Sequence, residues 1–249
     1  MGSLNLRAKI NQGDGFSKDI CLADEEIEIA RSLVRDQWLS HLKEVAPEHT
    51  EKFAEYGLAR YHELANLVDH NSIWPKKERI LPLSVVPKIR KMSIFKTLEE
   101  EFGSLILAWD EVYWRLVRPN QPSDVGPLHA DKWFLTYGDG PAPPPGMQRV
   151  KVWIALYCEP GLNGLCFVPR SQLKEWNHHG EMRHGFTKPQ IDEEVQKLNA
   201  QLIPTHPGEA LVFNDGTLHG GAFNKGKYTR VNFEFAIFVP KDENTKNKG

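Results

Sequence analysis

The sequence predicts a mostly β protein in which an antiparallel sheet structure is flanked by helices on one side. Helix-like segments come first in the chain, and strand-like segments follow from about Leu105 to Val239. Turn dipeptides such as Asp139-Gly140 and Asp215-Gly216 divide the strand-like part. Helices followed by strands favour a fold in which the two kinds of element are segregated. At 249 residues the chain is long enough for one sizeable core, so we expect a single domain over 1–249.

The first part of this domain, 1–104, is predicted to contain helices and an irregular segment. A helix is expected to begin at Asp24, whose side chain would cap it, because three glutamates follow closely. Its buried face would consist of apolar residues at helical spacing, namely Ile27, Ala30, Val34, Trp38 and Val45. A second helix is predicted from about Glu48 to Val68. Between His70 and Lys91, prolines interrupt any helix and basic residues gather, which indicates an irregular segment lying over another part of the protein.

The second part, 105–239, contains two strands whose faces can be assigned from the alternation of residue types. Every second residue is apolar between Arg149 and Tyr157, and the same holds between Thr229 and Phe238. The apolar residues are Val150, Val152, Ile154 and Leu156 in the first segment and Val231, Phe233, Phe235 and Ile237 in the second. Such strands bury one apolar face against helices, so the opposite polar face has to line a cavity or meet water. Arg230 lies on that polar face.

The composition narrows the classes of partner and the compartment. The 31 basic and 33 acidic residues give a net charge of -2, which provides no basic field for nucleic acid. No apolar run approaches the ~18 residues of a membrane-spanning helix, and residues 1–10 lack the apolar stretch of a signal peptide. The cysteines Cys21, Cys158 and Cys166 are too few for a disulfide framework. We expect a cytoplasmic protein whose partner is a small-molecule substrate, with its oligomeric state left open.

Two histidines and a carboxylate stand at spacings that suit a metal site. His129 and Asp131 are two positions apart, and in a strand such residues point to the same side. His219 would complete the set of catalytic metal ligands from another strand. Two imidazoles and one carboxylate on one face of Fe(II) leave three positions open, enough for a bidentate 2-oxo acid and O2. Arg230, eleven positions after His219, would hold the far carboxylate of that acid.

Residues from about Trp109 to Val239 resemble the Fe(II)/2-oxoglutarate-dependent oxygenases of the phytanoyl-CoA dioxygenase-like group. The segments that carry the resemblance are Leu128-His129-Ala130-Asp131-Lys132-Trp133, Val152-Trp153-Ile154-Ala155-Leu156, Asn163-Gly164-Leu165-Cys166-Phe167-Val168-Pro169-Arg170-Ser171, Pro207-Gly208-Glu209-Ala210-Leu211 and the His219/Arg230 pair. The resemblance implies a double-stranded β-helix, or jelly roll, with iron on His129, Asp131 and His219 and 2-oxoglutarate on Arg230. It also implies hydroxylation of a substrate with Fe(II), 2-oxoglutarate and O2, release of succinate and CO2, and stimulation by ascorbate.

Further residues on the same strands are candidates for the walls of this site. Trp153 and Asn232 point into the predicted cavity, where they would contact the cosubstrate or the substrate, although packing without a specific contact explains them equally well. Tyr113 and Arg115 share one face of a preceding strand and are candidates of the same kind. Lys151 is the alternative residue for the carboxylate of 2-oxoglutarate.

The segment 172–202 is longer than a hairpin needs and is expected to form a lid over the site. Its histidines, His178, His179 and His184, fit a solvated lid better than a second metal site, because no acid or thiol follows at a matching spacing. Basic residues near the expected mouth are Lys76, Lys77, Arg79, Lys151 and Arg183. They suggest a polar or anionic substrate such as a sugar acid or glycolipid head group, an amino-acid derivative or a natural-product intermediate. A solvated face would have the same composition.

Three other functions compete with the hydroxylase. A halogenase on this scaffold lacks the carboxylate ligand, so Asp131 argues against it. A nucleic-acid demethylase would show a second arginine after Arg230, where this chain has Asn232 and Glu234. The alternative from a different class is a metal-binding, cupin-like isomerase or binding protein that does not use 2-oxoglutarate. Release of succinate from 2-oxoglutarate separates this alternative from the oxygenase.

Overall fold

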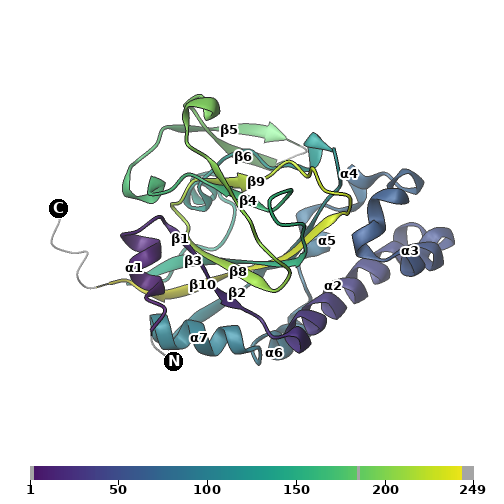
Figure 1. The fold of residues 1–249 in the computed structure, drawn as a ribbon, viewed down its shortest axis with the longest axis horizontal. Coiled ribbons are helices and arrows are strands. Elements are labelled where there is room, and N and C mark those ends of the chain that lie inside the picture. Colours follow the sequence, from purple (N-terminus) through teal and green to yellow (C-terminus); the bar gives the residue numbers. More distant parts are fainter. Residues whose placement is uncertain (1–2, 184–185, 243–249) are drawn as a thin grey trace.

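The computed structural model describes residues 3–183 and 186–242, and its strands form antiparallel sheets (Figure 1). The largest is a five-stranded sheet with the strand order β1-β8-β3-β10-β2. Its strands are β1 (Phe16–Cys21), β8 (Glu209–Asn214), β3 (Met147–Tyr157), β10 (Arg230–Pro240) and β2 (Ile106–Val117). A three-stranded sheet contains β7 (Gln201–Ile203), β4 (Leu165–Phe167) and β9 (His219–Gly221), in that order. A separate hairpin pairs β5 (His178–Arg183) with β6 (Phe186–Ile191).

Helices cover one face of the five-stranded sheet and lie below it in Figure 1. The long helix α2 (Asp24–Val45) and the shorter α7 (Ser93–Phe102) pack their apolar residues against this face. The sheet residues of that core include Val150, Val152, Ile154, Leu156, Val231, Phe233, Phe235 and Ile237. The face assignments for β3 and β10 are therefore confirmed, as is the prediction of a mostly β protein with N-terminal helices on one sheet.

The helices begin and end differently from the prediction at several points. Ala23 and not Asp24 is the N-cap of α2, and the side chain of Glu26 accepts a hydrogen bond from the backbone N–H of Ala23. Val45 is 45 % exposed at the end of this helix, whereas Leu42 is buried. The predicted second helix is interrupted at Gly57, whose φ of 72° is unfavourable for other residues.

After this interruption the chain continues in tighter turns. The second helix is thus divided into α3 (Thr50–Tyr56) and the 3-10 turns Leu58–Glu63 and Ala65–Leu67. The segment His70 to Lys91 contains the short helices α4 (His70–Ile73), α5 (Lys76–Arg79) and α6 (Val86–Ile89). It lies along β2, where Ile80 bridges to Tyr113 and the backbone N–H of Leu81 donates to Val112.

Three elements have no counterpart in the sequence prediction, namely α1 (Leu6–Asn11), β1 and α7. β1 is an edge strand of the five-stranded sheet and pairs with β8. Within 3–183 and 186–242, no helix has the length and apolar character required to cross a bilayer.

Substitutions on the buried and exposed faces of α2 test how this helix packs on the sheet. Leu42→Ala should lower the free energy of unfolding by about 2–5 kcal/mol, because it removes a fully buried side chain and leaves a cavity. Ile29→Ala on the same helix is the control, and because Ile29 is 43 % exposed its effect should stay within about 0.5 kcal/mol. Urea unfolding followed by circular dichroism measures both, and equal losses would contradict this arrangement of the helix.

Candidate metal centre

The three predicted metal ligands come together between the two sheets. His219 begins β9, and its backbone forms an isolated antiparallel bridge with His129, with hydrogen bonds of 2.9 and 2.8 Å in the two directions. The sequence suggested that Asp131 lies in a strand with His129. In the structure Asp131 instead starts the 3-10 turn Asp131–Tyr137. A single backbone bridge, followed by this turn, therefore brings His129 and Asp131 to one place.

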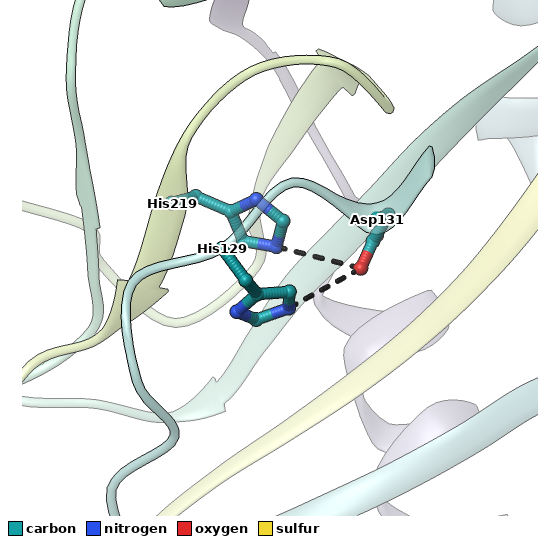
Figure 2. A group of neighbouring side chains, drawn as sticks. All are labelled: His129, Asp131 and His219. Carbon is teal, nitrogen blue, oxygen red and sulfur yellow. Dashed lines mark ion pairs between the residues drawn. The ribbon is translucent and has the colours of Figure 1, made fainter. Parts of the chain in front are cut away.

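The side chains of the three residues converge on a common point (Figure 2). Nε2 of His129 lies 3.4 Å from Oδ1 of Asp131, and Nε2 of His219 lies 3.8 Å from the same oxygen. All three potential ligand atoms lie within 4.8 Å of one another. This spacing suits a single ion held by two nitrogens and one oxygen, the donor set of facial-triad iron sites.

Backbone carbonyls orient both imidazoles for metal binding. Nδ1 of His129 lies 2.8 Å from the carbonyl of Pro127, and Nδ1 of His219 lies 3.0 Å from the carbonyl of Thr217. A carbonyl only accepts, so each Nδ1 donates its proton and each Nε2 keeps a free lone pair. Hydrogen bonds from the distal ring nitrogen are the usual means of fixing a metal-binding tautomer.

The electrostatics of the triad keep its ligands in the forms that bind a metal. Burial alone would raise the pKa of Asp131, but the ammonium of Lys151 and both imidazoles outweigh it and hold this pKa well below its usual range. Burial lowers the pKa of His219 to about 4, so that the ring is neutral at physiological pH. Oδ2 of Asp131 is buried and has no hydrogen-bond partner. A buried carboxylate and two free lone pairs therefore fit a divalent cation.

Aromatic rings enclose the histidines. Phe167 and Phe213 lie against His219 with ring centroids 5.7 and 4.6 Å away, and Phe134 meets His129 edge-on at 5.3 Å. Trp153 belongs to the same apolar cluster as the two phenylalanines beside His219. This lining keeps the triad away from bulk water.

A second layer of charged residues supports Asp131, and the sequence analysis missed two of them. Lys151 is 3 % exposed at its side chain and lies 3.7 Å from Oδ2 of Asp131 and 2.8 Å from Glu111. Arg149 donates to the backbone carbonyl of Asp131 at 2.7 Å. Arg149 and Glu111 lie two positions from Lys151 and Tyr113 on the polar faces of their strands. That alternation could have identified them.

Arg230, Asn232 and Trp153 lie on the polar face of the five-stranded sheet. Arg230 and Trp153 line a cavity there as expected, whereas Asn232 is fully buried and is not among the residues that line this cavity. Arg230 is 2 % exposed and makes one hydrogen bond, from Nη1 to the carbonyl of Gly164 at 3.3 Å. Its Nε and both polar side-chain atoms of Asn232 are buried without partners. Burial lowers the pKa of Arg230 to about 10 together with the charge of Arg115, and the carboxylates of Glu234 and Asp124 do not offset this shift. A guanidinium in this state fits an anionic ligand.

The triad and Arg230 line one cavity of about 600 Å³. Its outer walls come from three segments, and residues of the expected lid are among them. They are residues of α4 and α5 with Trp74, the loop Ser123 to Pro127, and Thr187 to Pro189 of β6. Lys76 and Arg79 line the cavity, whereas Lys77 is 77 % exposed and pairs with Glu78.

The histidines of the lid segment form no metal cluster among the described residues. His178 stacks on Trp133 with a centroid separation of 4.4 Å, and His179 pairs with Asp192 at 2.6 Å. His184 and the side chain of Arg183 lie outside the described part of the chain.

Comparison with known proteins agrees with this geometry. The family model described as Phytanoyl-CoA dioxygenase (PhyH) matches residues 82–232. The search of curated proteins found no match. Solved structures share the fold: a non-heme monooxygenase, ThoJ in its apo form, has a TM-score of 0.54 at 17% identity, over 94% of this chain and 77% of its own. EvdO2 from Micromonospora carbonacea var. aurantiaca has a TM-score of 0.56 at 14% identity, over 96% and 91%. The predicted jelly roll is thereby confirmed.

Metal titration tests the triad directly. The protein should bind one divalent cation per chain, and His219→Ala should abolish this binding, because two remaining ligands hold the ion weakly. Calorimetric titration with Fe(II) under anaerobic conditions gives the stoichiometry, and circular dichroism shows whether the fold is retained. The matched control is His179→Ala, which changes an exposed histidine and should leave binding intact. Undiminished binding by folded His219→Ala would disprove the site.

Proposed function

We infer the function from one premise: the chain belongs to the phytanoyl-CoA dioxygenase family. Members of this family are non-haem Fe(II)/2-oxoglutarate-dependent oxygenases. We propose that this one hydroxylates a small polar or anionic substrate with release of succinate and CO2. The observation that carries the proposal is the buried set of His129, Asp131 and His219, with its free ligand atoms pointing to one place.

In this proposal the three residues hold Fe(II) on one side of the cavity. When bound there, the ion supplies open coordination positions at which a 2-oxo acid and O2 react. His129 and His219 contribute their Nε2 atoms, since the carbonyls of Pro127 and Thr217 occupy the other ring nitrogens. Asp131 contributes the negative charge, and Oδ1 is the oxygen that both histidines face.

Arg230 is the residue that we assign to the far carboxylate of 2-oxoglutarate. Its guanidinium is buried on the same cavity wall, has an unpartnered Nε and lies 5.7 Å from the ring centroid of Trp153. The ring excludes water from this contact and thereby strengthens it. Asn232, two residues along β10, is fully buried and does not line the cavity, so we do not assign it to the cosubstrate. Lys151 pairs with Glu111 and faces Asp131, so we assign it to the support of the metal ligand.

The outer part of the cavity is left for the substrate. It carries Lys76, Arg79, Tyr113, Arg115 and Asp139, which recognise polar groups and not long hydrocarbon chains. A sugar acid or glycolipid head group, an amino-acid derivative or a natural-product intermediate fits such a lining.

Turnover of the cosubstrate tests the proposed reaction class. With Fe(II), ascorbate and O2, the purified protein should convert 2-oxoglutarate slowly to succinate even without its substrate. Asp131→Ala should abolish this conversion and retain the circular dichroism of the wild type, because the substitution removes one metal ligand. Succinate is quantified by chromatography. If metal-loaded wild type releases none, the chain is instead a metal-binding protein of the kind that does not use 2-oxoglutarate.

The clamp is tested by Arg230→Ala. Loss of a shielded, charge-assisted ion pair of roughly 1.5–3 kcal/mol should weaken the binding of 2-oxoglutarate on the order of ten- to a hundredfold or beyond. Calorimetry on the Ni(II)-loaded protein measures the affinity without turnover. Arg60→Ala is the control, because Arg60 is an exposed residue that pairs with Glu63 far from the cavity lining. An unchanged affinity in Arg230→Ala would assign the carboxylate to another basic residue.

A further inference from the structure

Tyr113 on β2 is surrounded by basic side chains at the outer part of the cavity. Its ring centroid lies 5.4 Å from the Lys76 ammonium, 6.0 Å from the Arg79 guanidinium, 5.8 Å from that of Arg115 and 5.6 Å from the Lys151 ammonium. All five residues line the cavity, and we call them the Tyr113 cluster. Tyr113 is 6 % exposed, whereas the side chains of Lys76 and Arg115 are 33 % and 40 % exposed, so part of the positive charge around this buried ring meets solvent.

The two lysines of this cluster have a strong counter-charge. Glu111 receives hydrogen bonds from Lys76 at 3.0 Å and from Lys151 at 2.8 Å, one at each carboxylate oxygen. Lys76 also lies 3.8 Å from Asp139, and Lys151 lies 3.7 Å from Asp131. The lysines are therefore matched by carboxylates that belong to the protein.

The two arginines of the cluster are not matched in the same way. Arg79 donates only to the backbone carbonyls of Trp74 and Trp114, at 3.0 and 2.8 Å, among the described residues. Arg115 faces Glu234 at 3.2 Å, but its Nε and the Oε1 of Glu234 form no hydrogen bond. Burial would lower the pKa of Arg115, but Tyr113 and Glu234 outweigh it and raise this pKa above its ordinary value. Arg79 is therefore the guanidinium of the two that has no carboxylate partner among the described residues.

The pKa of Arg79 agrees with this lack of a carboxylate partner. Burial lowers the pKa of Arg79 to about 10, and the charge of Arg115 lowers it further, which means that the two guanidinium groups repel each other. Arg230, to which we assign the cosubstrate, shows the same lowered pKa of about 10 because of burial and the charge of Arg115. At Arg79 the cavity therefore contains a second guanidinium whose charge an anion would stabilise.

We propose that Arg79 and Arg115, with the hydroxyl of Tyr113, form a subsite for an oxyanion of the substrate, a carboxylate or a phosphate. The inference rests on the proposed oxygenase function and specifies its substrate class. The Lys151 ammonium lies 5.6 Å from the ring centroid of Tyr113 and 3.7 Å from Asp131, so one side chain separates the subsite from a metal ligand. The oxidised carbon of the substrate is then only a few bonds from its anionic group.

The subsite is tested with simple anions in place of the unknown substrate. Ni(II)-loaded protein saturated with 2-oxoglutarate is titrated with sulfate, as the tetrahedral probe, and with acetate, as the planar one. Calorimetry should show one anion bound per chain without displacement of 2-oxoglutarate. The tighter of the two probes distinguishes a phosphate-bearing from a carboxylate-bearing substrate.

Two substitutions should change this anion affinity in opposite directions. Arg115→Gln should weaken it about tenfold or more, since it removes a charge-assisted contact. Glu234→Gln should strengthen it, because it removes the carboxylate that competes for Arg115. Lys77→Gln is the matched control, since it removes an exposed charge from the same short helix as Arg79 and should have no effect.

The outcomes separate this inference from the function on which it rests. Loss of anion binding in Arg115→Gln with an unchanged affinity for 2-oxoglutarate supports the subsite. Displacement of 2-oxoglutarate by either anion, or an equal loss of cosubstrate affinity in Arg115→Gln, would assign these arginines to the cosubstrate and overturn it. Absence of anion binding while 2-oxoglutarate binds normally also overturns it. If Arg115→Gln does not fold, Glu234→Gln decides. Failure of 2-oxoglutarate itself to bind would instead remove the oxygenase function.

Discussion

The polar face of the five-stranded sheet is buried, and each charge on it has to be matched inside the cavity. Glu111, Arg149, Lys151, Arg230 and Glu234 are all less than 9 % exposed on this face. An unpaired buried charge costs several kcal/mol, and four of these groups form ion pairs: Glu111 with Lys151, Arg149 with Asp215, and Glu234 with Arg115. The groups that remain without a good partner define what the cavity can bind. The buried charges that lack a partner within the protein are thus the ones available to bind a ligand.

The apolar packing on the opposite face of the same sheet stabilises the strands that carry these buried charges. The apolar residues of β3 and β10 pack against α2 and α7, and this burial holds the strands in register while their other sides carry charge. Phe235 stacks on Phe95 of α7 with a centroid separation of 5.0 Å. From this face the helices fix the strands from which Arg230 and Lys151 project.

The sequence was sufficient for those features that depend on local alternation or on a few chemically distinctive residues. Alternating residues assigned both faces of β3 and β10, and the spacing of His129, Asp131, His219 and Arg230 indicated the site that the fold brings together. Features that depend on distant partners were not predictable. β1 is a strand because β8 offers it an edge, and Glu111 belongs to the site only because its side chain reaches Lys151 across the intervening strand β10. The prediction of a continuous second helix was wrong for a local reason, because Gly57 has a positive φ and ends the helix there.

The backbone bridge between His129 and His219 has a consequence for how the protein matures. It joins two segments that are far apart in the sequence, and both must be in place before the imidazoles can face each other. During synthesis the segment with His129 leaves the ribosome well before the one with His219, and non-local pairings of this type form late in folding. A nascent chain that lacks β9 therefore cannot yet bring His129, Asp131 and His219 together.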